Sequence, residues 1–391
     1  MRAPRAGLHG TPGALWVLYL DTFTMAVGFY MLIPLLAFHL LENLSLTIAF
    51  IALLTAVRSA VQNGLMPITG WIADRIDYKR AILGGVLIRA AGFAALGTVD
   101  SPELLLVASV LTGLGGALFH PASYAAYSAL AAGRDTVRVY STRELVSNVG
   151  FIVGPVIGGL LAGADFAIVS FSAAALFLTA FFITLIGLPS GMSTSAKERT
   201  FFRAVFSDRP FICFCLVASG ISVMISQLYL VVPLRARDVL PGPEGVGLVY
   251  TGAAILMVFT MLPSTKFATA RFSAYKILAF AALALGSGLA IMGLWSSITG
   301  LFVGVAFFTI GQMLAQPVMN AVAAKFTQDG SVASYFGVLG LAHAVGGIIG
   351  TTTGGLLYTI AESDSWGSEL VWWAFPAWAL IVGAAFVKLK T

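Results

Sequence analysis

Residues 166–189 read FAIVSFSAAALFLTAFFITLIGLP and contain no charged side chain. As a helix this run would extend about 36 Å, which exceeds the roughly 30 Å hydrocarbon core of a bilayer. Comparable apolar stretches recur from Ala14 to Val387, separated by short polar breaks. They remain apolar on every face, whereas the strands of a membrane barrel alternate between apolar and polar residues. The sequence therefore predicts an all-α membrane protein.

The composition agrees with this prediction and excludes other classes of protein. Hydrophobic residues make up 59% of the chain and charged residues only 10%, far below the roughly 25% of soluble proteins. The net charge of +5 is spread over many short loops, so we expect no nucleic-acid partner. We find no phosphate-binding loop, zinc-ligand spacing or nucleophile elbow. An enzyme is therefore not expected, and neither is a metal or another cofactor.

Hydropathy predicts twelve transmembrane helices. With both termini in the cytosol, the inner segments hold seventeen Lys and Arg residues and the outer loops hold two, Arg235 and Arg237. This asymmetry follows the positive-inside rule and predicts a multi-pass membrane protein with both termini cytoplasmic. The predicted spans are 14–38, 46–71, 80–99, 103–131, 139–163, 166–189, 209–234, 244–265, 275–294, 297–324, 331–360 and 369–388.

The longest polar break, residues 190–208, divides the chain into two predicted six-helix bundles, 1–189 and 209–391. Several features return after a shift of 196 residues: Gly115 with Gly311, His120-Pro121 with Gln316-Pro317, and Gly154, Gly158 and Gly159 with Gly350, Gly354 and Gly355. A duplicated bundle is implied. In transporters built from such repeats the substrate site lies between the halves.

The predicted loop between the second and third helices carries a motif. It reads Gly70-Trp-Ile-Ala-Asp74-Arg75-Ile-Asp-Tyr-Lys79-Arg80 and resembles the G-x-x-x-D-R-x-G-R-K/R signature of the major facilitator superfamily. The resemblance implies that Asp74 and Arg75 help to lock an inner gate between the two halves. Asp77 occupies the position at which the family usually has Gly. The other reading is an ordinary charged turn.

The predicted fifth helix contains Gly150-Phe-Ile-Val-Gly154-Pro155-Val-Ile-Gly158-Gly159. This resembles the G-x-x-x-G-P-x-x-G-G motif of the drug:proton antiporter branch of the same superfamily. Glycines four residues apart form a smooth stripe that lets helices approach closely, and Pro155 permits a bend. The motif predicts a gating helix, and generic small-residue packing is the alternative.

Ionisable residues inside predicted spans are the strongest functional signals, because each costs about 2.5–3.5 kcal/mol at a helix centre. They are Asp21, Arg58, Arg89, Arg143 and Glu144. We hypothesise that Asp21 and Glu144 exchange protons. Burial raises the pKa of a carboxyl group and a nearby guanidinium lowers it, so movement of Arg58 or Arg143 would couple protonation to access. A permanent Asp21–Arg58 ion pair is the structural alternative, and Arg89 is expected to be structural.

The stretches around Asp21, Arg58 and Arg89 resemble a branch of bacterial multidrug exporters of this superfamily. The resemblance implies a proton-coupled antiporter of a bacterial inner membrane that expels small amphipathic compounds. We expect it to act as a monomer in the lipid bilayer. A dedicated exporter of one metabolite, such as a siderophore, and a non-transporting receptor are the alternatives. If the layout of the superfamily holds, the substrate cavity is lined by Phe23, Met25, Tyr30, Tyr124, Tyr127, Gln227, Tyr229, Gln312, Gln316 and Asn320.

Overall fold

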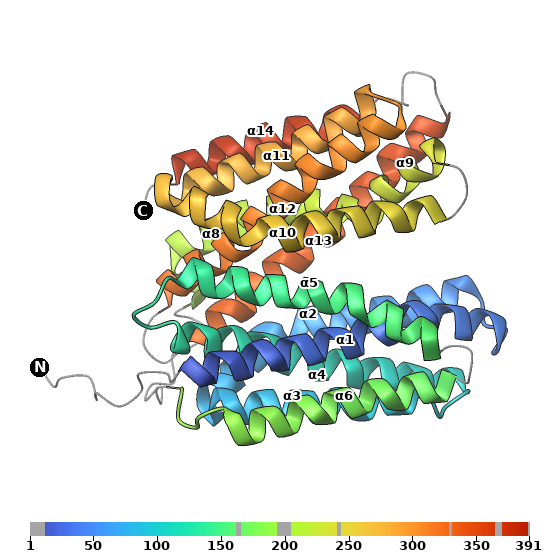
Figure 1. Ribbon diagram of the computed structural model, residues 1–391, viewed down its shortest axis with the longest axis vertical. Helices are drawn as coiled ribbons and strands as arrows, with labels where there is room; N and C mark the ends of the chain where they lie inside the picture. The colour runs from blue at the N-terminus through green and yellow to red at the C-terminus, as the bar shows by residue number, and fades with distance from the viewer. Residues whose placement is uncertain are drawn as a thin grey trace, which may run out of the picture. The chain divides into compact units, whose positions relative to one another are not determined.

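In a computed structural model of the chain, residues 12–161, 166–193, 205–240, 244–327, 331–363 and 370–389 are described, and they are almost entirely helical. Figure 1 shows the helices. Those of the first half are α1 (Pro12–Glu42), α2 (Ile48–Ile76), α3 (Tyr78–Leu96), α4 (Pro102–Leu130), α5 (Thr136–Leu161) and α6 (Phe166–Gly187). Those that follow are α8 (Arg209–Ile225), the 3-10 helix η1 (Ser226–Tyr229), α9 (Val231–Val239), α10 (Glu244–Arg271), α11 (Ala274–Leu294), α12 (Ile298–Phe326), α13 (Val332–Ser363) and α14 (Leu370–Lys388).

The chain forms two compact units. One unit comprises residues 1–205 together with 324–341, and the other comprises 206–323 together with 342–391. In the first unit, α1 packs against α5 and α6, while α3 packs against α4 and α6 (Figure 1). In the second unit, α11 packs against α14. The first turns of α13 belong to the first unit and the remainder of this helix to the second.

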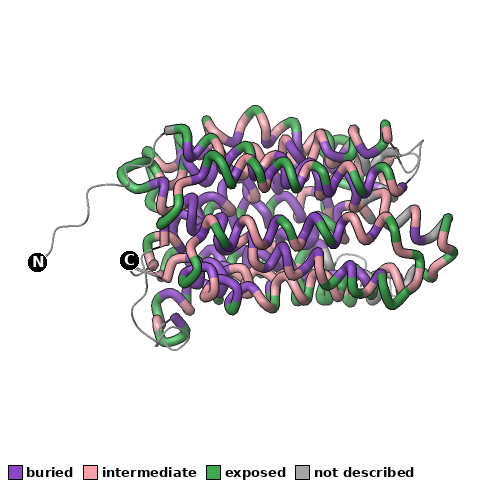
Figure 2. The backbone as a smooth tube through the Cα atoms, turned by 90° about the horizontal axis from the view of Figure 1, so that it is seen from below, coloured by how far each residue is buried: buried purple, intermediate pink, exposed green. Residues whose placement is uncertain are grey.

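Nine helical segments of the described chain are long and apolar enough to cross a membrane. The helices α2 and α3 and the shorter apolar segment Trp372–Lys388 lie at the other three predicted spans. Buried and exposed positions alternate along the helices (Figure 2), which is the pattern of helices that pack on one side only. Exposed positions include large apolar residues such as Leu160 and Ile186. Such surfaces suit a lipid solvent.

The structure corrects two predicted boundaries. The second predicted span ends at residue 71, and we expected Asp74 and Arg75 in a loop, but α2 continues to Ile76. A basic residue in the last turn favours a helix C-terminus, and Asp77 then ends the helix with a φ of 88°. The motif is therefore mostly the last two turns of a helix.

The predicted span 209–234 is also interrupted, because α8 ends at Ile225 and gives way to η1 and α9. Side chains explain the break. Ser226 Oγ and Gln227 Nε2 both donate to the carbonyl oxygen of Val223, at 2.8 Å each. They occupy an acceptor that backbone amides would otherwise use, which favours a tighter turn.

Glycine contacts confirm the internal duplication. A Cβ at Gly115 of α4 would lie 2.7 Å from the carbonyl oxygen of Gly85 in α3, and a Cβ at Gly311 of α12 would lie 2.7 Å from that of Ala281 in α11. Both members of the second contact lie 196 residues after those of the first. The same shift relates two more pairs of contacts: Gly92 on Ala108 with Gly288 on Gly304, and Gly154 on Val27 with Gly350 on Val223.

Candidate functional site

Asp74 joins the end of α2 to the first turn of α13. Its buried carboxylate accepts the backbone N–H groups of Ala333, at 2.9 Å, and Ser334, at 3.0 Å. It also accepts the hydroxyl groups of Ser334 and Tyr78. The first turn of a helix has unpaired amide groups and a positive dipole end, so a carboxylate is stabilised there.

Glycines on both helices let α2 and α13 approach each other closely at this junction. A Cβ at Gly70 of α2 would collide with the backbone of Ala333, and a Cβ at Gly337 of α13 would collide with the backbone of Met66. Of the other motif residues, Arg75 is exposed and its guanidinium lies 3.9 Å from the centroid of the Trp71 ring, and Arg80 is exposed as well. Gly70 and Asp74 thus form the contact, while the two arginines lie at its surface.

Asp77 ties the turn after α2 to the chain that follows α6. Its carboxylate accepts three successive backbone N–H groups, those of Gly191 and Met192 at 2.9 Å each and that of Ser193 at 3.2 Å. Lys79 binds the same region, donating to the carbonyl oxygens of Leu185 and Leu188. Sequence reasoning missed this contact, and the unusual Asp at a glycine position was its only signal.

The motif glycines of α5 pack directly against α1. A Cβ at Gly154 would lie 2.9 Å from the backbone of Met31 and of Val27, and Gly158 lies against the Met31 carbonyl. Pro155 is exposed. Gly159 has no heavy atom within 4 Å of its Cβ position. A Cβ at Gly150 would also lie 2.6 Å from Ala26 of α1, so Gly150, Gly154 and Gly158 together set the α1–α5 distance, whereas Gly159 does not.

Asp21 of α1 is fully buried and contacts α6. Thr184 of α6 donates a hydrogen bond of 3.0 Å to its Oδ1, while Oδ2 has no hydrogen-bond partner among the described residues. Arg58 does not pair with it: the one ion pair that joins two described residues is that of Arg143 with Glu144. A buried carboxyl group with one unsatisfied oxygen is costly and can be relieved by a proton.

Arg143 and Glu144 form that ion pair within α5. The Arg143 guanidinium also lies 4.1 Å from the centroid of the Tyr124 ring, which stacks on Phe336 of α13 at 5.3 Å. The pair is largely buried, with side chains 7% and 16% exposed. Glu144 therefore sits beside an aromatic contact between α4 and the first turns of α13.

Arg58 and Arg89 converge on one ring. Their guanidinium carbons lie 5.2 Å and 4.8 Å from the centroid of Phe29 in α1. Arg89 is buried, and its charge also faces Phe93 and Phe177. Both arginines were singled out from the sequence, but their convergence was not, because it depends on how α2 and α3 are rotated.

The expected cavity residues have diverse surroundings. In the first unit Met25 and Tyr127 are buried, with the Tyr127 hydroxyl bonded to Thr22, while Phe23, Tyr30 and Tyr124 are half-buried. In the second unit Tyr229 is exposed, Gln312 and Gln316 are half-buried, and Gln227 and Asn320 are buried. Gln227 Oε1 and Asn320 Nδ2 have no hydrogen-bond partner among the described residues. The described side chains include no cluster of three or more His, Cys, Asp or Glu that could hold a metal ion.

The chain is similar to known membrane transport proteins over most of its length. The family model described as Major Facilitator Superfamily matches residues 18–351. Multidrug resistance protein MdtH of Edwardsiella ictaluri is 29% identical over 359 residues, covering 91% of this chain and 89% of that protein. Multidrug resistance protein MdtH of Yersinia enterocolitica is 29% identical over 368 residues, covering 94% and 92%.

Solved structures share the fold. A bacterial homologue of the iron transporter ferroportin, in an outward-facing state, superposes with a TM-score of 0.77 at 16% identity, covering 96% of this chain and 99% of that one. The Escherichia coli fucose:proton symporter FucP superposes with a TM-score of 0.75 at 16% identity, covering 95% and 97%. At such identities the likeness concerns the fold alone.

Proposed function

Because the chain belongs to the Major Facilitator Superfamily, we propose that it is a proton-coupled antiporter that exports small amphipathic organic compounds by alternating access. Membership makes it a multi-pass membrane transporter of small molecules and not an enzyme. Export of drug-like compounds is supported by the relatives named as multidrug resistance proteins. We place it in a bacterial inner membrane, as a monomer with both termini in the cytosol.

The observation that carries proton coupling is the buried Asp21 carboxyl group with its one unsatisfied oxygen. The fold does not need an acid there, because the position 196 residues later in the duplicated bundle is Val217. An intramembrane acid that the architecture can replace with an apolar residue points to function. In our proposal Asp21 takes up a proton when it is exposed to one compartment and releases it to the other.

Glu144 is proposed as a second proton-exchanging group. The guanidinium of its partner Arg143 lies over the ring of Tyr124, and this ring stacks on Phe336 at the beginning of α13. Rearrangement of that contact would alter the Arg143–Glu144 pair and so change the proton affinity of the acid. Positions 339 and 340, at the same shift, are Leu and Gly, so the pair is likewise dispensable to the fold.

The gate in this proposal is the junction of Asp74 with α13. Four hydrogen bonds converge on one carboxylate, and rigid-body motion of the helices can break and re-form them together. The glycine face of α5 would let α1 slide without changing its distance from α5. Antiport then requires that proton binding and substrate binding favour opposite movements.

The test is a pH-gradient assay in proteoliposomes with cationic, neutral and anionic compounds. We expect a proton gradient to drive uptake of amphipathic compounds into inverted vesicles, and we expect Asp21→Asn to abolish this uptake. Glu144→Gln should reduce it. Asp100→Asn, which removes an acid from the turn between α3 and α4, is the control and should not change it. Full activity of both Asp21→Asn and Glu144→Gln would reject the assignment, and a strict preference for one anionic chelator would favour the dedicated metabolite exporter.

A further inference from the structure

Two cationic side chains share one aromatic ring inside the first unit. Since Arg58 and Arg89 lie 5.2 Å and 4.8 Å from the Phe29 centroid, their guanidinium groups are within about 10 Å of each other. Arginine keeps its charge in proteins. Two positive charges are therefore held close together in the apolar interior of a helical bundle, where their mutual repulsion is weakly screened.

No carboxylate in the described part of the chain compensates these charges. The ion pair of the described residues belongs to Arg143 and Glu144, and the Asp21 carboxylate is bonded to Thr184. Arg58 donates one long hydrogen bond, of 3.5 Å, to Gln62. Arg89 is only 5% exposed, and its Nε is buried without a hydrogen-bond partner among the described residues.

The aromatic rings stabilise the cations but do not neutralise them. Phe29, Phe93 and Phe177 surround the Arg89 guanidinium at 4.8–6.0 Å, and the negative faces of such rings attract a cation. They also leave the donor hydrogens of the guanidinium unsatisfied, because a ring is a poor acceptor. A small anion would supply both the opposite charge and the acceptor.

The architecture of the bundle does not require either arginine. The residues 196 positions later, in the duplicated bundle, are Ala254 and Leu285. Both are buried, and Leu285 packs against Gly311 as Arg89 packs against Gly115. A helix pair of the same geometry is thus built with apolar side chains. The two arginines are extra charges that the fold must accommodate.

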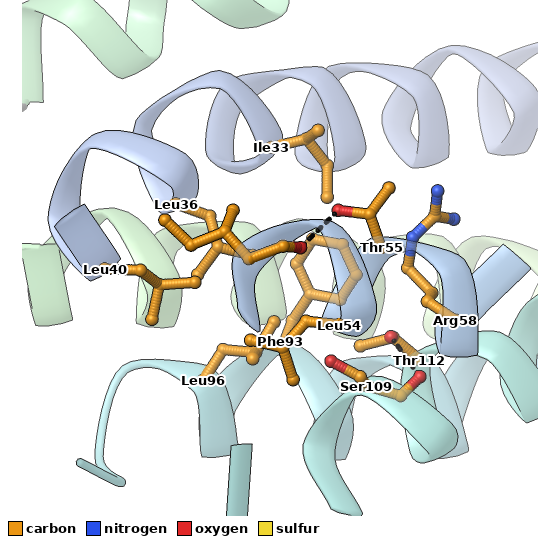
Figure 3. A pocket seen from close by; sticks show the side chains of 11 residues that line it. Ile33, Leu36, Leu40, Leu54, Thr55, Arg58, Phe93, Leu96, Ser109 and Thr112 are labelled. Atoms are coloured by element: carbon orange, nitrogen blue, oxygen red, sulfur yellow. Dashed lines mark hydrogen bonds between the residues drawn. The ribbon is translucent and has the colours of Figure 1, made fainter. Parts of the chain in front are cut away.

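A cavity of about 50 Å³ lies between α1, α2, α3 and α4 and is lined by Arg58 but not by Arg89. Figure 3 shows Arg58 at one end of it, away from Leu36, Leu40 and Leu96. Its polar wall consists of Arg58, Thr55, Ser109 and Thr112, and Phe93, which also faces Arg89, contributes a ring. One water needs about 10–15 Å³, so the cavity accommodates a small ion and excludes a drug-sized molecule.

We propose that Arg58 and Arg89 form a binding site for a small monovalent inorganic anion, with chloride as the representative ligand. The anion neutralises the two guanidinium groups and accepts their free N–H donors. This site is separate from Asp21 and from the gate. It goes beyond the proposed antiport, because it can be tested by binding alone.

The experiment measures binding of radioactive chloride to the purified full-length protein in detergent, with gluconate replacing chloride at constant ionic strength. We expect saturable binding that bromide displaces and gluconate does not. The variants Arg58→Ala and Arg89→Leu copy the residues of the duplicated bundle, so they suit this packing. Combined, they should lower bound chloride at least tenfold.

Arg138→Gln is the matched control, because it removes an exposed arginine of the same unit and should leave binding unchanged. Thermal unfolding gives a second measurement, since a ligand that binds the folded state raises its melting temperature. Chloride should raise that temperature for the wild type but not for the double variant. The proposal is overturned if the wild type binds no chloride saturably, or if the double variant binds as much as the wild type.

Discussion

The carboxylate of Asp74 accepts both the backbone N–H and the side-chain hydroxyl of Ser334. Asp74→Asn keeps the shape of the side chain but removes its charge. It also replaces one carboxylate oxygen by an NH₂ group, which cannot accept the backbone N–H groups of α13. A hydrogen bond to a charged group is worth about 1.5–3 kcal/mol. We therefore expect the ratio of molecules with the α2–α13 contact formed to those with it open to fall at least tenfold, and we expect the transport rate to fall as well. Ser334→Ala removes one donor and should have a smaller effect.

The opening of this contact can be measured chemically. Met66 is 7% exposed and lies against Gly337 and Gly340 of α13. In a chain whose two native cysteines are replaced by Ser, a cysteine at position 66 should react faster with a maleimide when Asp74→Asn is present. Equal labelling rates with and without Asp74→Asn would show that the carboxylate does not hold the junction closed.

Asp77 combines a strained backbone with a useful side chain. Its φ of 88° and ψ of 138° suit glycine, and another residue there costs about 1–3 kcal/mol. Asp77→Gly relieves the strain but loses the three hydrogen bonds to residues 191–193. Asp77→Ala keeps the strain and also loses the bonds. We therefore expect Asp77→Ala to be the least stable of the three proteins, by about 1–3 kcal/mol relative to Asp77→Gly.

Thermal unfolding in detergent checks this order, and limited proteolysis checks the anchoring of the chain after α6. Both variants should be cleaved faster than the wild type in the region 190–208. If Ala and Gly variants unfold at the same temperature, the turn does not require the positive φ, and if neither is cleaved faster, Asp77 does not anchor that segment.

The glycine motif of α5 provides an internal comparison. A methyl group at Gly154 would meet the backbone of α1 at 2.9 Å, whereas one at Gly159 would meet nothing within 4 Å. Backbone cannot yield as a flexible side chain can, so we expect Gly154→Ala to cost about 1–3 kcal/mol and to impair transport. Gly159→Ala should be tolerated. Equal transport and stability of the two variants would reduce the motif to generic small-residue packing.

How much could be predicted from the sequence depends on the range of each interaction. The helices, the duplication and the contact residue Gly154 follow from local composition and spacing. The interruption of the predicted span 209–234 could not be predicted, because apolar residues continue through it. The side chain of Gln227 at the interruption donates a hydrogen bond to the carbonyl oxygen of Gly350, 123 positions away. The partners of Asp77 lie 114 to 116 positions along the chain, beyond any local pattern.

The candidate site shows the same division. Intramembrane charge alone singles out Asp21 and Arg58, because the bilayer makes such residues costly. Their partners were not predictable, since rotation of a helix about its axis decides which neighbours a side chain meets. An Asp21–Arg58 pair was considered from the sequence, but the structure places Thr184 beside the acid and Phe29 beside the arginine.

Thr184 provides the most direct test of how Asp21 is held. Thr184→Val preserves the shape of the side chain and removes the only hydroxyl that donates to Asp21 among the described residues. A buried acceptor left without its donor costs about 1–3 kcal/mol, so we expect a lower melting temperature and slower proton-coupled transport. Thr184→Ser retains the hydroxyl and should restore both. Thr179→Val, on an exposed position of the same helix, is the control. If Thr184→Val matches this control in stability and transport, the hydrogen bond neither stabilises the bundle nor positions the carboxyl group.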